Sequence, residues 1–410
     1  MAQRKDNKGR VLRKGEYQKS MDNKYVYGYT DALGKRKYIY SKDLAELRER
    51  EEKLLKNQLD GLDIYVAGKA NVNFLFDRYM STKTNIRSNT YAGYTYIYDH
   101  FVRETIGKKI IGSVKYSEIL SFYLYLLNDK DLSISTVDSV HRLLYPAFEL
   151  AVRDDIVRKN PCKGAMAEIK RNTGKKSGVR QALTIEQQGA FLDYVKNSDT
   201  YDKWYVFMVF LFGTGCRIGE AIGIRWDDIR MDERFIDINH DITYSPRVDA
   251  DGRCELRVSD VKTRAGHRQI PMVNLVYETL LELYEIQKKY GFSAFELEGY
   301  TNFVFTNRFD KVHNPSTVNR AIERIRTSYN DEEVVKATKE HREPLIIPHF
   351  SCHHIRHTFC TRLCECESNL NVIQDIMGHA DIQTTMNIYA EATKQAKQKA
   401  ITGLSNMAIF

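Results

Sequence analysis

Long hydrophobic runs are absent from this sequence of 410 residues. The longest apolar stretch, residues 204–212, falls far short of the ~20 residues that a helix needs to cross a bilayer. The first residues, Met-Ala-Gln-Arg-Lys-Asp-Asn-Lys, contain no apolar core of the kind found in signal peptides. We therefore expect a cytoplasmic protein with no membrane partner.

Cysteine is also sparse, at seven residues, which is an odd number. Without a secretory signal, this number favours reduced thiols over a disulfide framework. Cys360, Cys364 and Cys366 lie close together, but no second pair completes the four-ligand set of a structural zinc site. The sequence thus predicts neither a metal site nor a disulfide scaffold.

Excess charge of one sign is small over the whole chain, with 62 Lys and Arg against 54 Asp and Glu, but it is large locally. Residues 1–41 contain eleven basic and four acidic residues. Residues 158–180 contain eight basic residues and a single acid, Glu168. Such concentrations suit a polyanion such as DNA, although basic tails and linkers also serve solubility alone. Charge by itself leaves the partner open.

The first 66 residues are predicted to form a small β-β-β-α unit. Tyrosines alternate with other residues at 25, 27 and 29 and again at 38 and 40, which predicts two strands joined by a turn at residues 32–34. A third strand is expected within residues 10–18, and Ser41 is a candidate cap for a helix beginning at Lys42. If the tyrosine face packs on that helix, the other face is available to DNA. The residues assigned to that other face are Lys24, Val26, Lys37 and Ile39.

Three further segments follow. Residues 67–162 are predicted to be a helical domain of four or five helices, because apolar residues recur at helical spacing from Val72 to Val157. The Gly-, Lys- and Ser-rich residues 163–182 predict a basic linker. Residues 183–410 predict a larger domain of mostly helices, with a few strands around residues 234–271. The expected fold class is multidomain and mostly α, with an α+β last domain.

Four short segments of the last domain contain unusual polar residues. Arg217 and Glu220 are one helical turn apart after an apolar helix, which suits either a phosphate clamp or an ordinary ion pair. Lys262 lies in a polar loop between two predicted strands of a hairpin, where a lysine is usually just solvated. Residues 353–357, His-His-Ile-Arg-His, lack the glutamate of the zinc-binding metalloprotease helix. The fourth segment runs from Gly-His at residues 378–379 to a tyrosine near the C-terminus.

Taken in order, these segments resemble the active site of the tyrosine recombinases, the family of phage lambda integrase. The matching motifs are Arg-Ile-Gly-Glu, Val-Lys-Thr, His-x-x-Arg-His-Thr, and Gly-His with a tyrosine ten residues after the histidine. Many family members have nine residues in that last interval, and conjugative-transposon integrases tolerate ten. Residues 132–136 and 155–161 resemble the family's core-binding domain. Residues 1–66 resemble the three-stranded arm-binding domain of conjugative-transposon integrases.

The resemblance implies an enzyme that cuts and rejoins DNA through a 3′-phosphotyrosine intermediate and a Holliday junction, and so integrates and excises a mobile element. The implied site residues are the phosphate-binding Arg217 and Arg356, the general acid Lys262, the proton acceptor His353, the hydrogen-bond donor His379, the nucleophile Tyr389 and the orienting Glu220. The tyrosyl ester keeps the bond energy, so no cofactor is expected. The implied partners are double-stranded DNA with core-type and arm-type sites, a homotetramer, an excisionase and a DNA-bending host protein.

Three alternatives remain from the sequence. A type IB topoisomerase shares this chemistry, but a separate arm-binding unit argues against it. A non-catalytic DNA-binding regulator with a decayed recombinase fold would not be expected to keep all six catalytic residues. A metal-dependent single-strand nickase normally has two histidines flanking one hydrophobic residue, and residues 353–357 lack that spacing.

Overall fold

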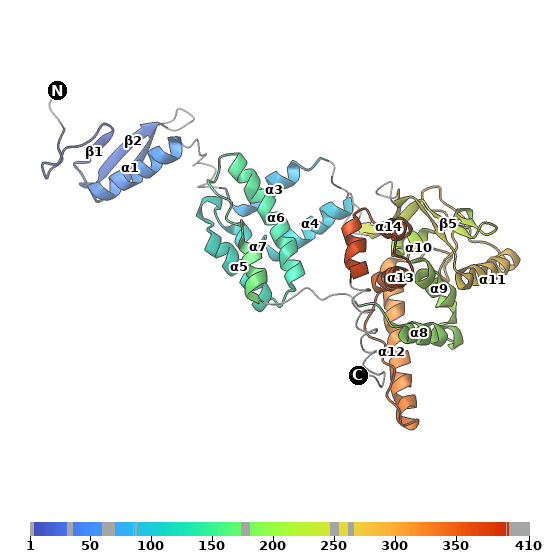
Figure 1. Cartoon of the computed structure of the whole chain (residues 1–410). Coiled ribbons are helices and arrows are strands. Elements are labelled where there is room, and N and C mark those ends of the chain that lie inside the picture. The colour runs from blue at the N-terminus through green and yellow to red at the C-terminus, as the bar shows by residue number, and fades with distance from the viewer. Residues whose placement is uncertain are drawn as a thin grey trace. The chain divides into compact units, whose positions relative to one another are not determined.

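The computed structural model describes residues 4–30, 36–59, 70–84, 86, 88–173, 181–246, 254–260, 266–390 and 392. The chain divides into two compact units, residues 1–177 and 178–410, each of which is described by itself (Figure 1). Among the described helices, none is both long and apolar enough to cross a membrane.

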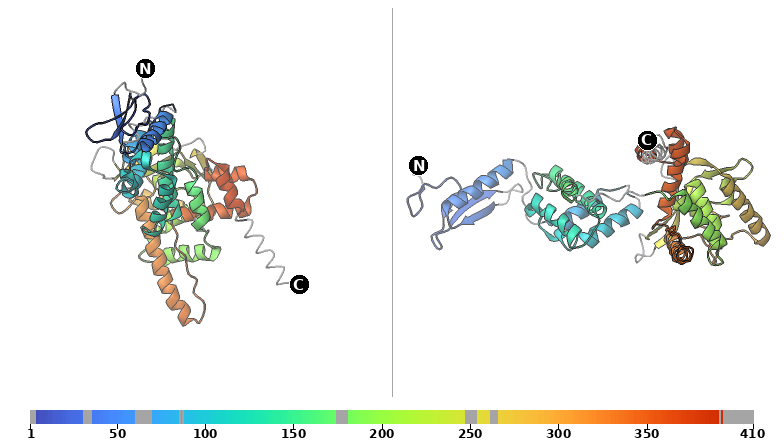
Figure 2. Two further views of the ribbon diagram at one scale, coloured as in Figure 1. Left: turned by 90° about the vertical axis from the view of Figure 1, so that its left-hand side faces the viewer. Right: turned by 60° about the horizontal axis from the view of Figure 1, so that its bottom comes forward.

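The N-terminal part of the first unit is an antiparallel sheet covered by one helix. Strands β1 (Glu16–Gln18), β2 (Tyr25–Thr30) and β3 (Arg36–Ser41) lie in that order, and α1 (Leu44–Leu59) crosses one face of the sheet (Figures 1 and 2). This arrangement confirms the predicted β-β-β-α unit. The helix cap differs from the prediction, because the Asp43 carboxylate accepts the backbone N–H groups of Ala45 and Glu46 at 2.7 and 3.2 Å. The predicted turn at residues 32–34 lies outside the described residues.

The register between β2 and β3 corrects part of the predicted DNA-binding face. Tyr27 is directly opposite Ile39, and Tyr29 is directly opposite Lys37. Directly opposite residues of an antiparallel pair share a face of the sheet. Ile39 and Tyr27 both pack against the cluster formed with the helix. Lys37 and Ile39 were predicted to lie on the face opposite the tyrosines of β2, and this prediction was wrong.

The rest of the first unit is a helical domain with its own core. Its main helices are α3 (Val72–Ser81), α4 (Ser88–Phe101), α5 (Tyr116–Asn128) and α6 (Ile134–Arg153), with 3-10 turns at Ile106–Lys108 and Ile111–Ser113. These elements confirm the predicted helical domain. A further helix, α7 (Ala165–Thr173), falls within the predicted linker. It buries Ala165, Met166 and Ile169 in the same core, so the helical domain extends beyond residue 162.

The second unit combines helices with two small antiparallel sheets. Its helices are α8 (Ile185–Asn197), α9 (Tyr205–Thr214), α10 (Ile218–Gly223), α11 (Asn274–Tyr290), α12 (Pro315–Lys339), α13 (Cys352–Cys366) and α14 (Leu370–Met377), with 3-10 turns at Asp202–Trp204 and Trp226–Asp228. Strands β4 (Ile229–Arg230), β5 (Phe235–Ile238) and β8 (Arg268–Pro271) form one sheet, in the order β4-β5-β8. Strands β6 (His240–Pro246) and β7 (Cys254–Asp260) form the other. The predicted mixture of helices with strands around residues 234–271 is confirmed.

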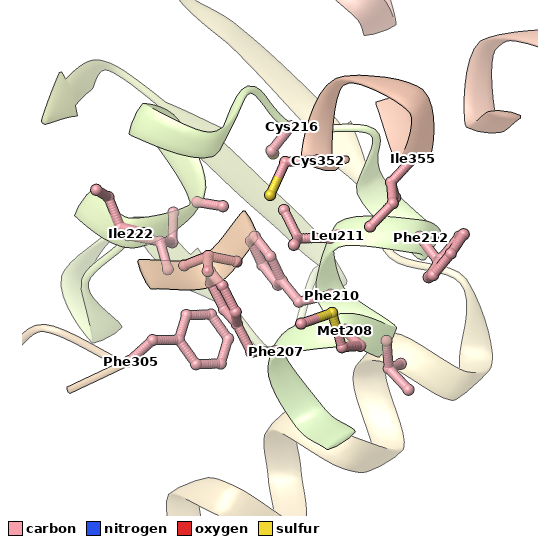
Figure 3. Close-up of a cluster of buried hydrophobic side chains, with 14 of the residues drawn as sticks. Phe207, Met208, Phe210, Leu211, Phe212, Cys216, Ile222, Phe305, Cys352 and Ile355 are labelled. Atoms are coloured by element: carbon pink, nitrogen blue, oxygen red, sulfur yellow. The ribbon is translucent and has the colours of Figure 1, made fainter. Parts of the chain in front are cut away.

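Helix α9 is the centre of the second unit. Its sequence is apolar on all sides, and a helix of this kind is buried all round. It packs against α8, α11 and α13. Figure 3 shows the side chains of α9 at the middle of the core, with Cys216, Cys352 and Ile355 at one edge. The same core therefore fixes both the loop after α9 and the start of α13. These two segments contain Arg217 and Arg356, the predicted phosphate-binding residues.

Candidate active site

A tight turn after α9 positions Arg217. Gly215 ends the helix with φ of 61°, a left-handed conformation that favours glycine. A Cβ atom at Gly215 would lie 2.3 Å from Cδ1 of Phe359, so α13 packs directly against this turn. Arg217 then becomes the N-cap residue of α10, and its backbone N–H donates to Oε2 of Glu220 at 2.8 Å.

Glu220 is buried and fully engaged. Oε1 accepts from Nη1 of Arg217 at 2.7 Å and from Nη1 of Arg268 at 3.0 Å. Oε2 accepts from Nη2 of Arg268 at 2.8 Å as well as from the Arg217 backbone. A carboxylate has about four acceptor positions, and these four donors fill them. Burial alone would raise the pKa of Glu220, but the hydrogen bonds and charges of Arg268 and Arg217 hold it at about 2, so the group is ionised.

Arg356 approaches from α13, one helical turn after His353, as predicted. It is 4% exposed. Its Nη1 donates to the carbonyl of Gly215 at 2.9 Å, and its Nη2 donates to the carbonyl of Met377. Burial, followed by repulsion from Arg217, lowers the pKa of Arg356 to about 10. That value still leaves the guanidinium charged at neutral pH.

His379 follows the end of α14, where Gly378 has a φ of 60°. Its backbone carbonyl accepts from Nε2 of Gln374 at 2.9 Å, and its Nδ1 lies 3.0 Å from the Thr385 hydroxyl. Burial and then the positive charges of Arg356 and Arg217 lower the pKa of His379 to about 4. The ring is therefore neutral at pH 7 and has one N–H to donate, as the predicted role requires.

Tyr389 and His353 belong to helices that are next to these groups in the fold. Residues 382–390 are helical, and Tyr389 is half-buried against a cluster that joins α13 and α14 through Cys360, Ile373 and Met377. His353 is exposed in the first turn of α13. Electrostatic interaction with His353 is one of the causes that lower the pKa of His379. Five of the six predicted catalytic residues therefore belong to segments that converge on the end of α14.

Lys262, the sixth, lies outside the described residues. The strands on either side of it are described, and they differ from the prediction. Strand β7 pairs with β6, whereas β8 pairs with β5 in the other sheet. The flanking strands were predicted to pair as one hairpin around Lys262, and this prediction was wrong.

Arg268 is a residue of the site to which the sequence analysis assigned no role. Its side chain is 0% exposed, and it binds Glu220 through both terminal nitrogens. The sequence contained one signal, which is the alternate spacing of Arg268 and Ile270 in a predicted strand, because residues at alternate positions share a face. The structure shows that both are buried. Together Arg217, Arg268 and Arg356, called here the arginine cluster, carry three positive charges against the one of Glu220. The excess suits an anion such as a phosphodiester.

A second cationic surface lies on the N-terminal sheet. A cleft of about 420 Å³ is lined by Lys19, Asp22, Lys24, Tyr40, Ser41, Lys42, Glu46 and Arg50. Four bases against two acids make it positive, and Nζ of Lys19 lies 5.0 Å from the centre of the Tyr40 ring. Of the four predicted DNA contacts, Lys24 lines this cleft. Val26 is 0% exposed, so its predicted contact with DNA was wrong.

Comparison with known proteins links both surfaces to described families. Residues 181–396 match the phage integrase family, and residues 1–58 match the DNA-binding domain of Tn916 integrase. The transposases from transposon Tn916 of Enterococcus faecalis and transposon Tn1545 of Streptococcus pneumoniae are each 30% identical to this chain over 403 residues. Each alignment covers 95% of this chain and 94% of the relative.

Solved structures give the same result. The Tn1549 transposon integrase in complex with transposon right end DNA matches with a TM-score of 0.69 and 28% identity, over 82% of this chain and 99% of that one. A lambda integrase dimer bound to a core site matches with a TM-score of 0.54 and 16% identity, over 93% of this chain and 95% of that one. The second likeness concerns the fold alone. Both confirm the predicted fold class.

Proposed function

Because the chain belongs to the phage integrase family of tyrosine recombinases, we propose that it integrates and excises a conjugative transposon, with Tyr389 as the residue joined to DNA. Enzymes of this family cut and rejoin DNA strands. The observation that carries the assignment of Tyr389 is the packing of its helix. Its helix packs on α13 and α14, the two helices that also carry Arg356 and lead to His379.

The proposed reaction exchanges one ester for another. The Tyr389 oxygen bonds to the scissile phosphorus while the bond from phosphorus to the 5′ oxygen breaks, leaving a 3′-phosphotyrosine and a 5′ hydroxyl. His353 accepts the tyrosine proton, and Lys262 supplies a proton to the 5′ oxygen. A 5′ hydroxyl from a second duplex reverses the step.

The arginine cluster supports this chemistry electrostatically. Negative charge accumulates on the non-bridging oxygens as the tyrosine attacks, and fixed guanidinium donors stabilise it. Arg217 is 41% exposed, so it is accessible to a ligand, whereas Arg356 is held by the carbonyls of Gly215 and Met377. His379, neutral at pH 7, adds a hydrogen bond without adding to the charge. We assign the phosphate to Arg217, Arg356 and His379.

Covalent trapping tests the nucleophile. A nicked duplex that loses its 5′ fragment after cleavage should accumulate an SDS-resistant protein–DNA adduct. Tyr389→Phe should bind the duplex within a few-fold of the parent and form no adduct, because the hydroxyl is needed for attack rather than affinity. Tyr290→Phe, at an exposed tyrosine that ends α11, is the matched control and should form the adduct normally. An adduct that persists in Tyr389→Phe would assign the nucleophile elsewhere.

We also propose a division of labour between DNA-binding regions. Residues 1–66 bind an arm-type site through the positive cleft around Lys24 and Lys42, while the helical and catalytic domains bind the core-type site. Replacing Lys24 and Lys42 by glutamine should weaken arm-site binding and flatten its salt dependence, because fewer counterions are released. Replacing Lys8, which lies outside the cleft, is the control. Equal losses in the cleft and control variants would place the arm-site contact elsewhere.

Assembly is the third part of the proposal. An apolar cavity of about 230 Å³ opens between α8, α9, α11 and α13, where it is lined by residues such as Leu192, Val209 and Val276. The sequence after Thr393 includes Leu404 and ends in Met-Ala-Ile-Phe. This segment lies outside the described residues, and we propose that it contacts the cavity of a neighbouring copy, as part of a homotetramer on DNA. Truncation after Thr393 and the substitution Leu192→Glu should both impair pairing of two sites and spare single-site binding. Normal recombination in either variant would contradict the assignment.

The remaining partners follow from the same function. A bivalent integrase needs its arm and core sites brought together, so we propose a DNA-bending host protein and an excisionase as accessory partners, and the cytoplasm as the compartment. The rival functions are separable by the same substrates. A type IB topoisomerase would relax supercoils without pairing sites, and a non-catalytic regulator would bind DNA and form no adduct.

A further inference from the structure

Three successive carbonyl groups at the end of α14 each accept a hydrogen bond from a different arginine. The pairs are Arg268 Nε with Ile376 O at 2.8 Å, Arg356 Nη2 with Met377 O, and Arg217 Nη2 with Gly378 O at 2.7 Å. The last carbonyls of a helix lack partners within it and lie at the negative end of its dipole. The end of α14 therefore orients the whole arginine cluster, and His379 follows it directly.

Arg268, like Arg356, is a buried member of the cluster. Its side chain is 0% exposed, whereas that of Arg217 is 41% exposed. Besides Ile376, it binds both oxygens of Glu220, at 3.0 and 2.8 Å, and the Gly266 carbonyl at 3.3 Å. These contacts use four of the five N–H directions of a guanidinium, so Arg268 is poorly placed to hold a DNA phosphate itself.

We propose that Arg268 is a positioning residue for DNA cleavage, which sets the orientation of Arg217 through Glu220 and the position of His379 through the end of α14. This inference rests on the proposed function, because it assumes that Arg217 and His379 bind the scissile phosphate. Arg268 reaches those two residues along separate contacts. In the described part of the chain, Arg217 is the other residue with hydrogen bonds to both Glu220 and the end of α14, and we have assigned it to the phosphate.

The geometry also indicates why an arginine is required here. The planar guanidinium of Arg268 donates to both carboxylate oxygens of Glu220, while its Nε donates in the same plane to the Ile376 carbonyl. The single ammonium group of a lysine cannot reproduce these three contacts. Arg268→Lys keeps the charge next to Glu220 and removes that geometry. If Arg268 served only to neutralise a buried carboxylate, lysine would restore much of its function. If it positions the cluster, lysine would not.

The test uses the full chain and the nicked trapping duplex, with three variants. Arg268→Lys removes the fork, Arg268→Met removes the charge, and Arg268→Met with Glu220→Gln removes both members of the pair, a replacement that often spares stability. Arg230→Met is the matched control, because Arg230 lies in the same sheet and pairs with Asp237 at 2.7 Å on the surface. Stability, DNA affinity and the single-turnover rate of adduct formation at saturating protein are measured for each. A second duplex carries a neutral methylphosphonate at the scissile position.

Arg268→Lys and the double variant are expected to form adduct at least 10-fold more slowly than the parent, with affinity within a few-fold. The slowing should be smaller on the methylphosphonate, because its neutral centre depends less on correctly placed arginines. Arg230→Met should match the parent. Parental rates in a stably folded Arg268 variant, or equal slowing on both duplexes, would overturn the proposal. If the parent itself forms no adduct, or Tyr389→Phe still forms one, the proposed function fails instead.

Discussion

Replacing Glu220 by glutamine tests whether one carboxylate holds the arginine cluster together. Glutamine keeps the shape of the side chain, but it removes the negative charge that faces Arg217 and Arg268. The Arg268 side chain is 0% exposed, so water cannot take the place of the lost carboxylate. We expect the catalytic domain of Glu220→Gln to fold with reduced stability and to cleave DNA slowly.

The magnitude follows from two independent considerations. The pKa of Glu220 is about 2 instead of its ordinary 4.5, although burial alone would have raised it. At 1.36 kcal/mol per pKa unit, this lowering corresponds to roughly 3 kcal/mol of stability that the ionised form gains on folding. Removing one partner from a buried ion pair typically costs about 3–5 kcal/mol. Both figures place the loss of unfolding free energy near 3–4 kcal/mol.

The two tryptophans of the chain make the measurement specific, because Trp204 and Trp226 both lie in the second unit. Tryptophan fluorescence during urea unfolding therefore reports this unit within the full chain. Because the folded pKa is depressed, the contribution of Glu220 is complete above pH 4.5 and is lost as the pH falls towards 2. Glu220→Gln should thus lose stability at pH 7 and show a flatter pH dependence between 4.5 and 2. A loss below about 1 kcal/mol would refute the reasoning.

Three further predictions concern other residues of the second unit. The pKa of His379 is about 4 instead of 6.5, so the folded unit keeps its full stability above pH 6.5 and loses stability as the pH falls towards 4. His379→Gln should flatten the pH dependence of the stability measured by fluorescence between pH 6.5 and 4, and an unchanged slope would contradict this. Lys262→Ala should slow cleavage of a normal phosphodiester far more than cleavage of a 5′-bridging phosphorothiolate, because a thiolate leaves without a proton; equal slowing would remove Lys262 from the role of general acid. Gly215→Ala should lower the free energy of unfolding in urea by roughly 1–3 kcal/mol, because of the positive φ and the contact with Phe359. Gly189→Ala is the control, and it should be neutral or stabilising because Gly189 has open space around it in α8.

Much of the fold could be predicted because local patterns determine it. Helical spacing of apolar residues from Val72 to Val157 gave the helical domain, and alternating tyrosines gave the N-terminal strands. The strand register could not be predicted. The face on which Lys37 and Ile39 lie depends on the length of the turn between the strands, and a shift of one residue exchanges the two faces. The helix α7 was missed because its Lys and Asn residues resemble a linker, although Ala165, Met166 and Ile169 contact the core.

The active site was predictable to the extent that its residues sit in short motifs. Arg217 with Glu220 and His353 with Arg356 lie within one turn of each other, so their proximity needs no tertiary information. Arg268 joins them from a strand 48 residues after Glu220, and sequence spacing contains no record of that contact. The pairing of β8 with β5 instead of β7 is equally non-local. Both depend on the packing of the whole second unit.

The packing around Gly215 explains how an apolar core determines the placement of charges. The carbonyl of Gly215 accepts from Arg356, and the residue's Cα faces the ring of Phe359 on the same helix. The turn that ends α9 is therefore fixed to α13 by one polar and one apolar contact, two residues before Arg217. A shift of α9 within its core would move Arg217 and Arg356 together, so their relative orientation is preserved. The position of that pair against the end of α14 is then set by buried contacts, which are that of Arg356 with Met377 and those of Arg268 with Glu220 and Ile376.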